Sequence, residues 1–104
     1  MAERQADAQG LTGPARDAHI RTHRFDHALD LAGRELLDGS VTGNAVDSVR
    51  DNLARVFTHH ARIARDHGME LVMYEGGTHA IVPIDMHDNP EMVEFFNALN
   101  YSDQ

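Results

Sequence analysis

The chain has 104 residues, of which 41% are hydrophobic and 25% charged, and this is the size and composition of one small globular domain. Its formal net charge of −8 disfavours binding to nucleic acid and to anionic membranes. The absence of cysteine excludes disulfides and thiolate metal sites. No segment has the length and apolarity of a membrane span, and residues 1–9 lack the apolar core of an export signal, so no localisation is indicated.

The first third of the chain predicts a short N-terminal segment and a long helix. Residues 1–12 are rich in alanine, glutamine and charge, and either fray or continue a helix that starts elsewhere. We expect a flexible segment here, ahead of a single domain over residues 13–104. Pro14 suits the first turn of a helix, which we expect to continue to Leu37. Its apolar residues recur at helical spacing and form one stripe: Ala18, Phe25, Leu29, Ala32 and Leu36.

A second long helix is predicted to end at His67, with Gly68 closing it. His60 and His67 fall on its apolar face, where we expect partly buried histidines. The other members of that face are Val46, Val49, Leu53, Val56, Phe57, Ile63 and Ala64. Three residues are possible N-caps of this helix: Asn44, Asp47 and Ser48.

A β-strand is predicted over Glu70–Tyr74, because four apolar residues in a row are typical of a strand buried on both faces. A long loop follows, and Asn89-Pro90 then begins a short C-terminal helix. The predicted class is α/β but mostly helical, with two long helices, one strand and one short helix. A single strand has no hydrogen-bonding neighbour, so we expect self-association, or a partner chain that completes the sheet.

The run Leu71-Val72-Met73-Tyr74-Glu75-Gly76-Gly77 with His79 resembles the seventh strand of retaining glycoside hydrolases with a (β/α)8 barrel, the superfamily called clan A. It also resembles the carboxyl-terminal part of large bacterial proteins that carry Tyr-Glu-Gly-Gly-x-His. The resemblance implies a partial (β/α)8-barrel segment whose parent hydrolyses a glycosidic bond in carbohydrate. It makes Glu75 the nucleophile and Tyr74 and His79 candidate substrate-binding residues, with no metal and no cofactor.

The same family needs a second glutamate as acid/base, usually after an asparagine, and this chain contains no Asn-Glu pair. Retaining hydrolysis requires two carboxyl groups about 5–5.5 Å apart. The isolated chain is therefore expected to be inactive. Without the resemblance, Glu75 is a surface acid before an ordinary glycine turn.

Two other functions stay open on the sequence alone. One is a small non-enzymatic helical interaction module that dimerises through the edge of the strand. The other is a histidine-rich metal binder, since histidines at i and i+4 on a helix can chelate a divalent ion. A solvated polar face explains the same histidines equally simply. The residues concerned are His19, His23 and His27 with Asp26 and Asp30 on one flank, and the loop group Asp85, His87 and Asp88.

Overall fold

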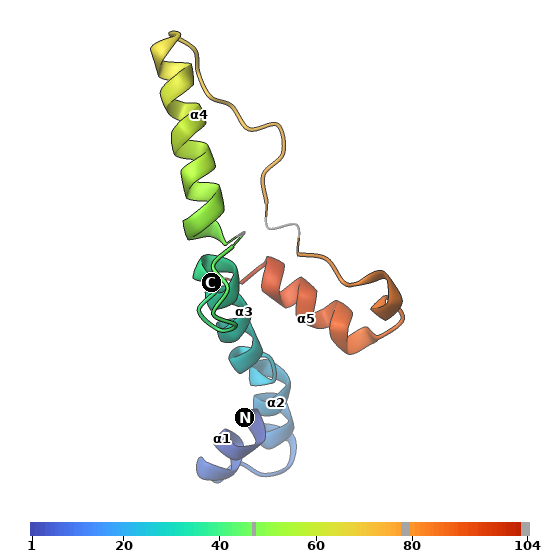
Figure 1. Ribbon diagram of the computed structural model, residues 1–104. Coiled ribbons are helices and arrows are strands. Elements are labelled where there is room, and N and C mark those ends of the chain that lie inside the picture. The colour runs from blue at the N-terminus through green and yellow to red at the C-terminus, as the bar shows by residue number, and fades with distance from the viewer. Residues whose placement is uncertain (47, 78–79, 103–104) are drawn as a thin grey trace. The chain divides into compact units, whose positions relative to one another are not determined.

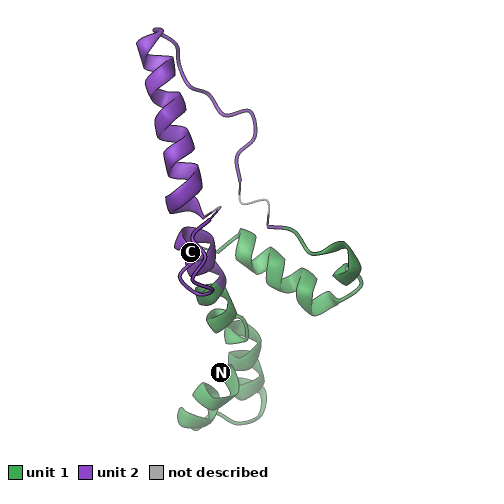
Figure 2. Cartoon of the chain, viewed as in Figure 1, with its two compact units in different colours: residues 1–31, 81–104 green, residues 32–80 purple. Residues whose placement is uncertain are grey.

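The computed structural model describes residues 1–46, 48–77 and 80–102, which form helices joined by turns and irregular segments (Figure 1). The chain divides into two compact units, Met1–Leu31 with Ile81–Gln104, and Ala32–Ala80 (Figure 2). A π-helix over Val49–Leu53 leads into α4, and a 3-10 helix over Ile84–Met86 precedes α5. The α-helices are α1 (Ala2–Ala8), α2 (Gly13–His23), α3 (Asp26–Asp38), α4 (Ala54–Asp66) and α5 (Pro90–Asn100).

The predicted α/β class and the partial (β/α)8-barrel segment are wrong, because no strand occurs within residues 1–46, 48–77 and 80–102. The predicted strand Glu70–Tyr74 is irregular backbone in the second unit. A strand is stabilised by the hydrogen-bonded ladder that it shares with a neighbour, and an apolar run offers no ladder by itself. Apolar composition alone thus misidentified this segment.

The predicted helix from Pro14 to Leu37 is two helices, α2 and α3, with an interruption at Arg24 and Phe25. Arg24 keeps right-handed helical angles, with φ −59° and ψ −31°, so the interruption is a local loss of hydrogen bonds. The N-terminal segment contains the helix α1, so of the two alternatives for residues 1–12 the structure has a helix there, and it begins within the segment. Of the three possible N-caps, the structure selects Ser48, whose side chain accepts from the Asp51 amide, and the predicted cap Asn89 opens α5.

In the first unit, α1 packs on α2 through small side chains and one ion pair. Ala2 and Ala6 are buried, and Arg16 Nε donates to Asp7 Oδ1 at 2.9 Å. Helix α5 is held by aromatic contact: the rings of Phe25 and Phe95 meet edge to face, with centroids 5.7 Å apart. Such a pair adds about 0.5–1.5 kcal/mol beyond the area that it buries.

In the second unit, α4 ends in a complete Schellman motif. Gly68 takes φ +65°, and the amides of Gly68 and Met69 donate to the carbonyls of Arg65 and Ala64 at 3.1 and 2.8 Å. Ser48, only 4% exposed, caps the π-helix that leads into α4. The helix is thus closed at both ends by its own neighbours in the sequence.

The turn after α3 is organised by one carboxylate. Glu35 accepts from the Thr42 hydroxyl at 2.6 Å and from the amides of Thr42 and Val41 at 3.0 and 3.2 Å. These hydrogen bonds, the hydroxyl first, hold the pKa of Glu35 below its usual value. Gly39 begins the turn at φ +67°, and a Cβ there would overlap the backbone of Asn44.

We expect Gly39→Ala to destabilise the second unit more than Gly43→Ala. Both glycines have positive φ, +67° and +79°, so each substitution carries the left-handed penalty of about 1–2 kcal/mol. Only Gly39 also meets backbone, whereas a Cβ at Gly43 meets nothing within 4 Å. Urea unfolding followed by helical circular dichroism measures both costs, and equal costs would contradict this account of the turn.

We expect the turn to loosen in acid. Because the folded-state pKa of Glu35 is lowered, its stabilisation is complete above the ordinary glutamate pKa of about 4.3 and is lost as pH falls through the lower folded value. Amide NMR shifts of Val41 and Thr42 follow that titration. Thr42→Val should raise the pKa of Glu35 toward its ordinary value, and an unchanged midpoint would refute the hydroxyl as the main cause.

Candidate functional site

The predicted catalytic segment lies on an exposed, irregular stretch after α4. Tyr74 is 98% exposed, and Glu75 is exposed beside it. His79, the other predicted substrate-binding residue, lies outside the described residues. Glu75 therefore does not stand at the end of a buried strand, which is the setting that made it a candidate nucleophile.

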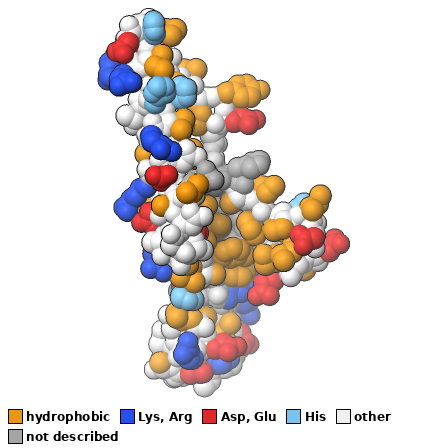
Figure 3. All heavy atoms as spheres, viewed as in Figure 1, with side chains coloured by type: hydrophobic (Ala, Val, Ile, Leu, Met, Phe, Trp, Pro, Cys, Tyr) orange, Lys and Arg blue, Asp and Glu red, His pale blue; other side chains and the backbone are white. Residues whose placement is uncertain are grey.

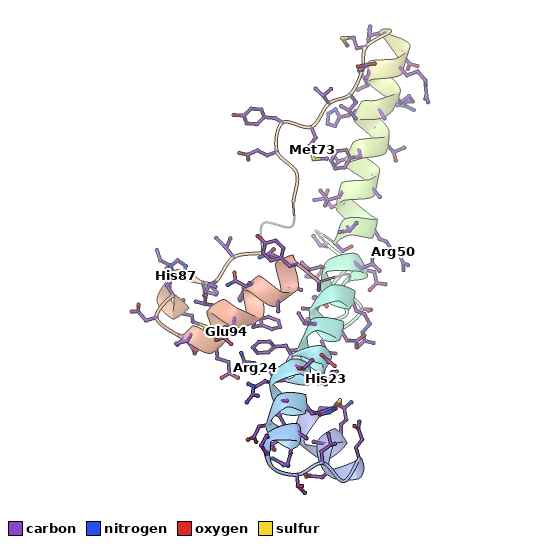
Figure 4. All side chains as sticks on the ribbon, turned by 180° about the vertical axis from the view of Figure 1, so that it is seen from behind. His23, Arg24, Arg50, Met73, His87 and Glu94 are labelled. Carbon is purple, nitrogen blue, oxygen red and sulfur yellow. The ribbon has the colours of Figure 1, made fainter. Side chains whose placement is uncertain are left out.

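Gly76 has a packing role that the sequence analysis did not foresee. A Cβ at Gly76 would lie 2.6 Å from Sδ of Met73, so this glycine lets the chain fold closely over that side chain. Met73 in turn points from the irregular segment toward α4 (Figure 4). This contact gives the first glycine of the Glu-Gly-Gly run a structural explanation that needs no ligand.

Two histidines of α2 lie side by side, and one of them contacts an aspartate at the start of α3. The rings of His19 and His23 have centroids 4.5 Å apart, and Nδ1 of His23 lies 2.8 Å from Oδ2 of Asp26. His27, the third member of the predicted row, is exposed. In the part of the chain that the structure describes, no three or more His, Asp or Glu side chains are placed to hold a metal ion.

The remaining candidate histidines are exposed. His60 and His67 were expected to be partly buried on the face of α4, and both are exposed, with His60 in edge contact with the ring of His59 at 5.4 Å. In the loop before α5, Nε2 of His87 lies 2.9 Å from the Val82 carbonyl oxygen. Asp85 and Asp88 are exposed there.

The apolar face of α4 is only partly covered, although its pattern predicted a face buried in a core. We define the α4 stripe as the apolar row along the π-helix and α4, which lies open to solvent together with histidine rings (Figure 3). The exposed fractions of its large members run from 38% to 46%, in Val49, Leu53, Val56, Phe57 and Ile63. Ala64, at 8%, is the buried member.

One cluster escaped the sequence analysis. Arg24 forms an ion pair with Glu94 of α5 and lies over the ring of Phe25, with its guanidinium carbon 4.5 Å from the ring centroid (Figure 4). Arg24 and Glu94 are far apart in the sequence, so no local spacing of residues predicts that they form a pair. Its position on the Phe25–Phe95 contact makes it part of the packing of α5.

Comparison with protein-family models, curated proteins and solved structures gives no match for this chain. The glycoside hydrolase resemblance therefore rests on the residues from Leu71 to His79 alone, and the roles of Glu75, Tyr74 and His79 stay predictions. Among the described residues, no helix has the length and apolarity needed to cross a membrane.

We expect the isolated chain to hydrolyse an activated aryl glycoside no faster than its Glu75→Gln variant. Retaining hydrolysis needs a second carboxyl group about 5–5.5 Å from the nucleophile, and the Asn-Glu pair that supplies it in the family is absent. Release of nitrophenolate, measured for both proteins and for buffer, tests this. Turnover by the unmodified chain that disappears in Glu75→Gln would overturn the expectation.

Proposed function

We propose that this chain is a non-enzymatic helical interaction module that associates with a second copy of itself through the α4 stripe. The observation that supports the proposal is the exposure of 38–46% in the large apolar residues of a helix whose pattern demands burial. Covering apolar area is worth about 25 cal/mol per Å², so a partner that covers the stripe gains free energy from every residue of the row.

The stripe is preformed. Ser48 caps the start of the π-helix, and the Schellman motif at Gly68 closes α4, so the helix needs no partner to satisfy its ends. Within the helix, the Thr58 hydroxyl donates to the Ala54 carbonyl at 2.7 Å on the side away from the stripe. The surface that a partner would contact is therefore already ordered, so binding costs little conformational entropy in α4.

The residues of the stripe complement one another when two copies run antiparallel. With the twofold axis at His60, Phe57 faces Ile63 of the second copy and Val56 faces Ala64. Each of these two pairs sets a larger side chain against a smaller one, which is how facing helices fill the space between them. Only the axis places two like polar groups together, the two His60 rings.

The charges of α4 suit the same arrangement. Arg55, Arg62 and Arg65 lie on the helix face opposite the stripe by their spacing, so an antiparallel pair leaves all three guanidinium groups in water. Dimerisation through the edge of a strand, as the sequence predicted, is excluded because residues 70–74 form no strand. The helix face replaces that edge.

We expect Phe57→Ser to weaken self-association about 10-fold or more. The dimer covers the exposed 41% of Phe57 in both copies, and a fully buried phenylalanine contributes about 1.5–3 kcal/mol. His60→Leu should strengthen association, since it replaces two facing polar rings at the axis by apolar side chains. Sedimentation equilibrium across a concentration series measures the dissociation constants.

Arg62→Gln is the matched control, because it alters α4 on the face away from the stripe. It should leave the dissociation constant within about twofold, as exposed charges contribute little to stability. A monomer at every concentration, or equal weakening by Arg62→Gln and Phe57→Ser, would refute the proposed dimer. Helical circular dichroism of each variant separates lost association from lost folding.

A further inference from the structure

The first unit holds a pair of imidazole rings whose polar groups are only partly satisfied. Nε2 of His19 is buried and has no hydrogen-bond partner. A buried polar atom without a partner costs free energy, so a group that binds this nitrogen would stabilise the unit. The adjacent ring belongs to His23, whose side chain is 41% exposed.

Asp26 prepares His23 to act as a ligand. Its Oδ2 lies 2.8 Å from Nδ1 of His23, so Nδ1 donates to the carboxylate and Nε2 is left with its lone pair free to coordinate. A carboxylate behind a histidine is the common outer-sphere arrangement at metal centres, where it fixes the tautomer and orients the ring. His23 ends α2 and Asp26 begins α3, and their separation of three residues is the spacing at which side chains meet along a helical backbone.

The spacing of the two rings fits one metal ion. With metal–nitrogen bonds of about 2.0–2.1 Å, two imidazoles that share an ion have ring centres roughly 4.5–5.2 Å apart for nitrogen–metal–nitrogen angles of about 90–109°. The rings of His19 and His23 have centroids 4.5 Å apart, at the right-angle end of that range. Right angles are the geometry of octahedral and tetragonal ions such as Ni²⁺ and Cu²⁺, rather than of tetrahedral Zn²⁺.

We infer that His19 and His23 form a binding site for one divalent late transition-metal ion, with Asp26 as the positioning residue behind His23 and water as the remaining ligands. The site uses two histidines, and so differs from clusters of three or more protein ligands, which the described residues do not contain. It lies in the first unit and does not involve the α4 stripe, so the metal site can be tested independently of the proposed dimer.

Calorimetric titration of the full chain with Ni²⁺ at pH 7.5 tests the site, with His27→Asn as the matched control because it removes the exposed histidine one turn beyond His23. We expect His19→Asn and His23→Asn each to weaken binding at least 10-fold. Asp26→Asn should weaken it about 10-fold, the lower end of the range for a lost outer-sphere partner. His27→Asn should stay within twofold.

NMR of the unmodified chain gives a second measurement that does not depend on any variant folding. Substoichiometric Ni²⁺ should broaden the ring signals of His19 and His23 before those of His27, His59 and His60. Uniform broadening of all histidines, or a loss of affinity in His27→Asn equal to that in His23→Asn, would overturn the site. Weaker binding of Zn²⁺ than of Ni²⁺ is expected from the right-angle geometry.

Discussion

A helix pairs its backbone amides and carbonyls within one segment, whereas a strand needs a second segment beside it. The secondary structure of this chain follows from that difference. Three helix ends are closed by nearby residues: the N-termini of the π-helix and α5 by Ser48 and Asn89, and the C-terminus of α4 by Gly68 with Met69. Because backbone pairing is local throughout, the elements form without a sheet, and the apolar segment 71–74 stays irregular.

Because the backbone hydrogen bonds are made within each helix, the helices form with little burial of side chains between them. Among the described residues no large side chain is fully buried, and the buried apolar residues are Ala2, Ala6, Ala64 and Leu99. Small residues allow close helix contact but remove little apolar area from water. The consequence is an amphipathic α4 whose large side chains are exposed. Self-association through the α4 stripe is our proposal for how that area is covered.

Several side-chain contacts lie at the ends of helices. His23 at the end of α2 contacts Asp26 at the start of α3, and Phe25 between them meets Phe95. In the turn after α3, Thr42 donates to Glu35. By contrast, the Tyr74-Glu75 segment has no element to orient its side chains, and Tyr74 is almost fully exposed.

The sequence by itself determined the local features: the cap at Asn89, the end of α4 at Gly68, and the apolar stripe along α4, whereas Ser48 was one of three possible caps. These features depend on neighbours a few residues apart, so spacing and residue type are sufficient. The tertiary structure alone decided that residues 70–74 are not a strand, that the α4 stripe is open, and that Arg24 pairs with Glu94. Each of these depends on which residues, distant in the sequence, come into contact, and the local spacing of residue types does not predict such contacts.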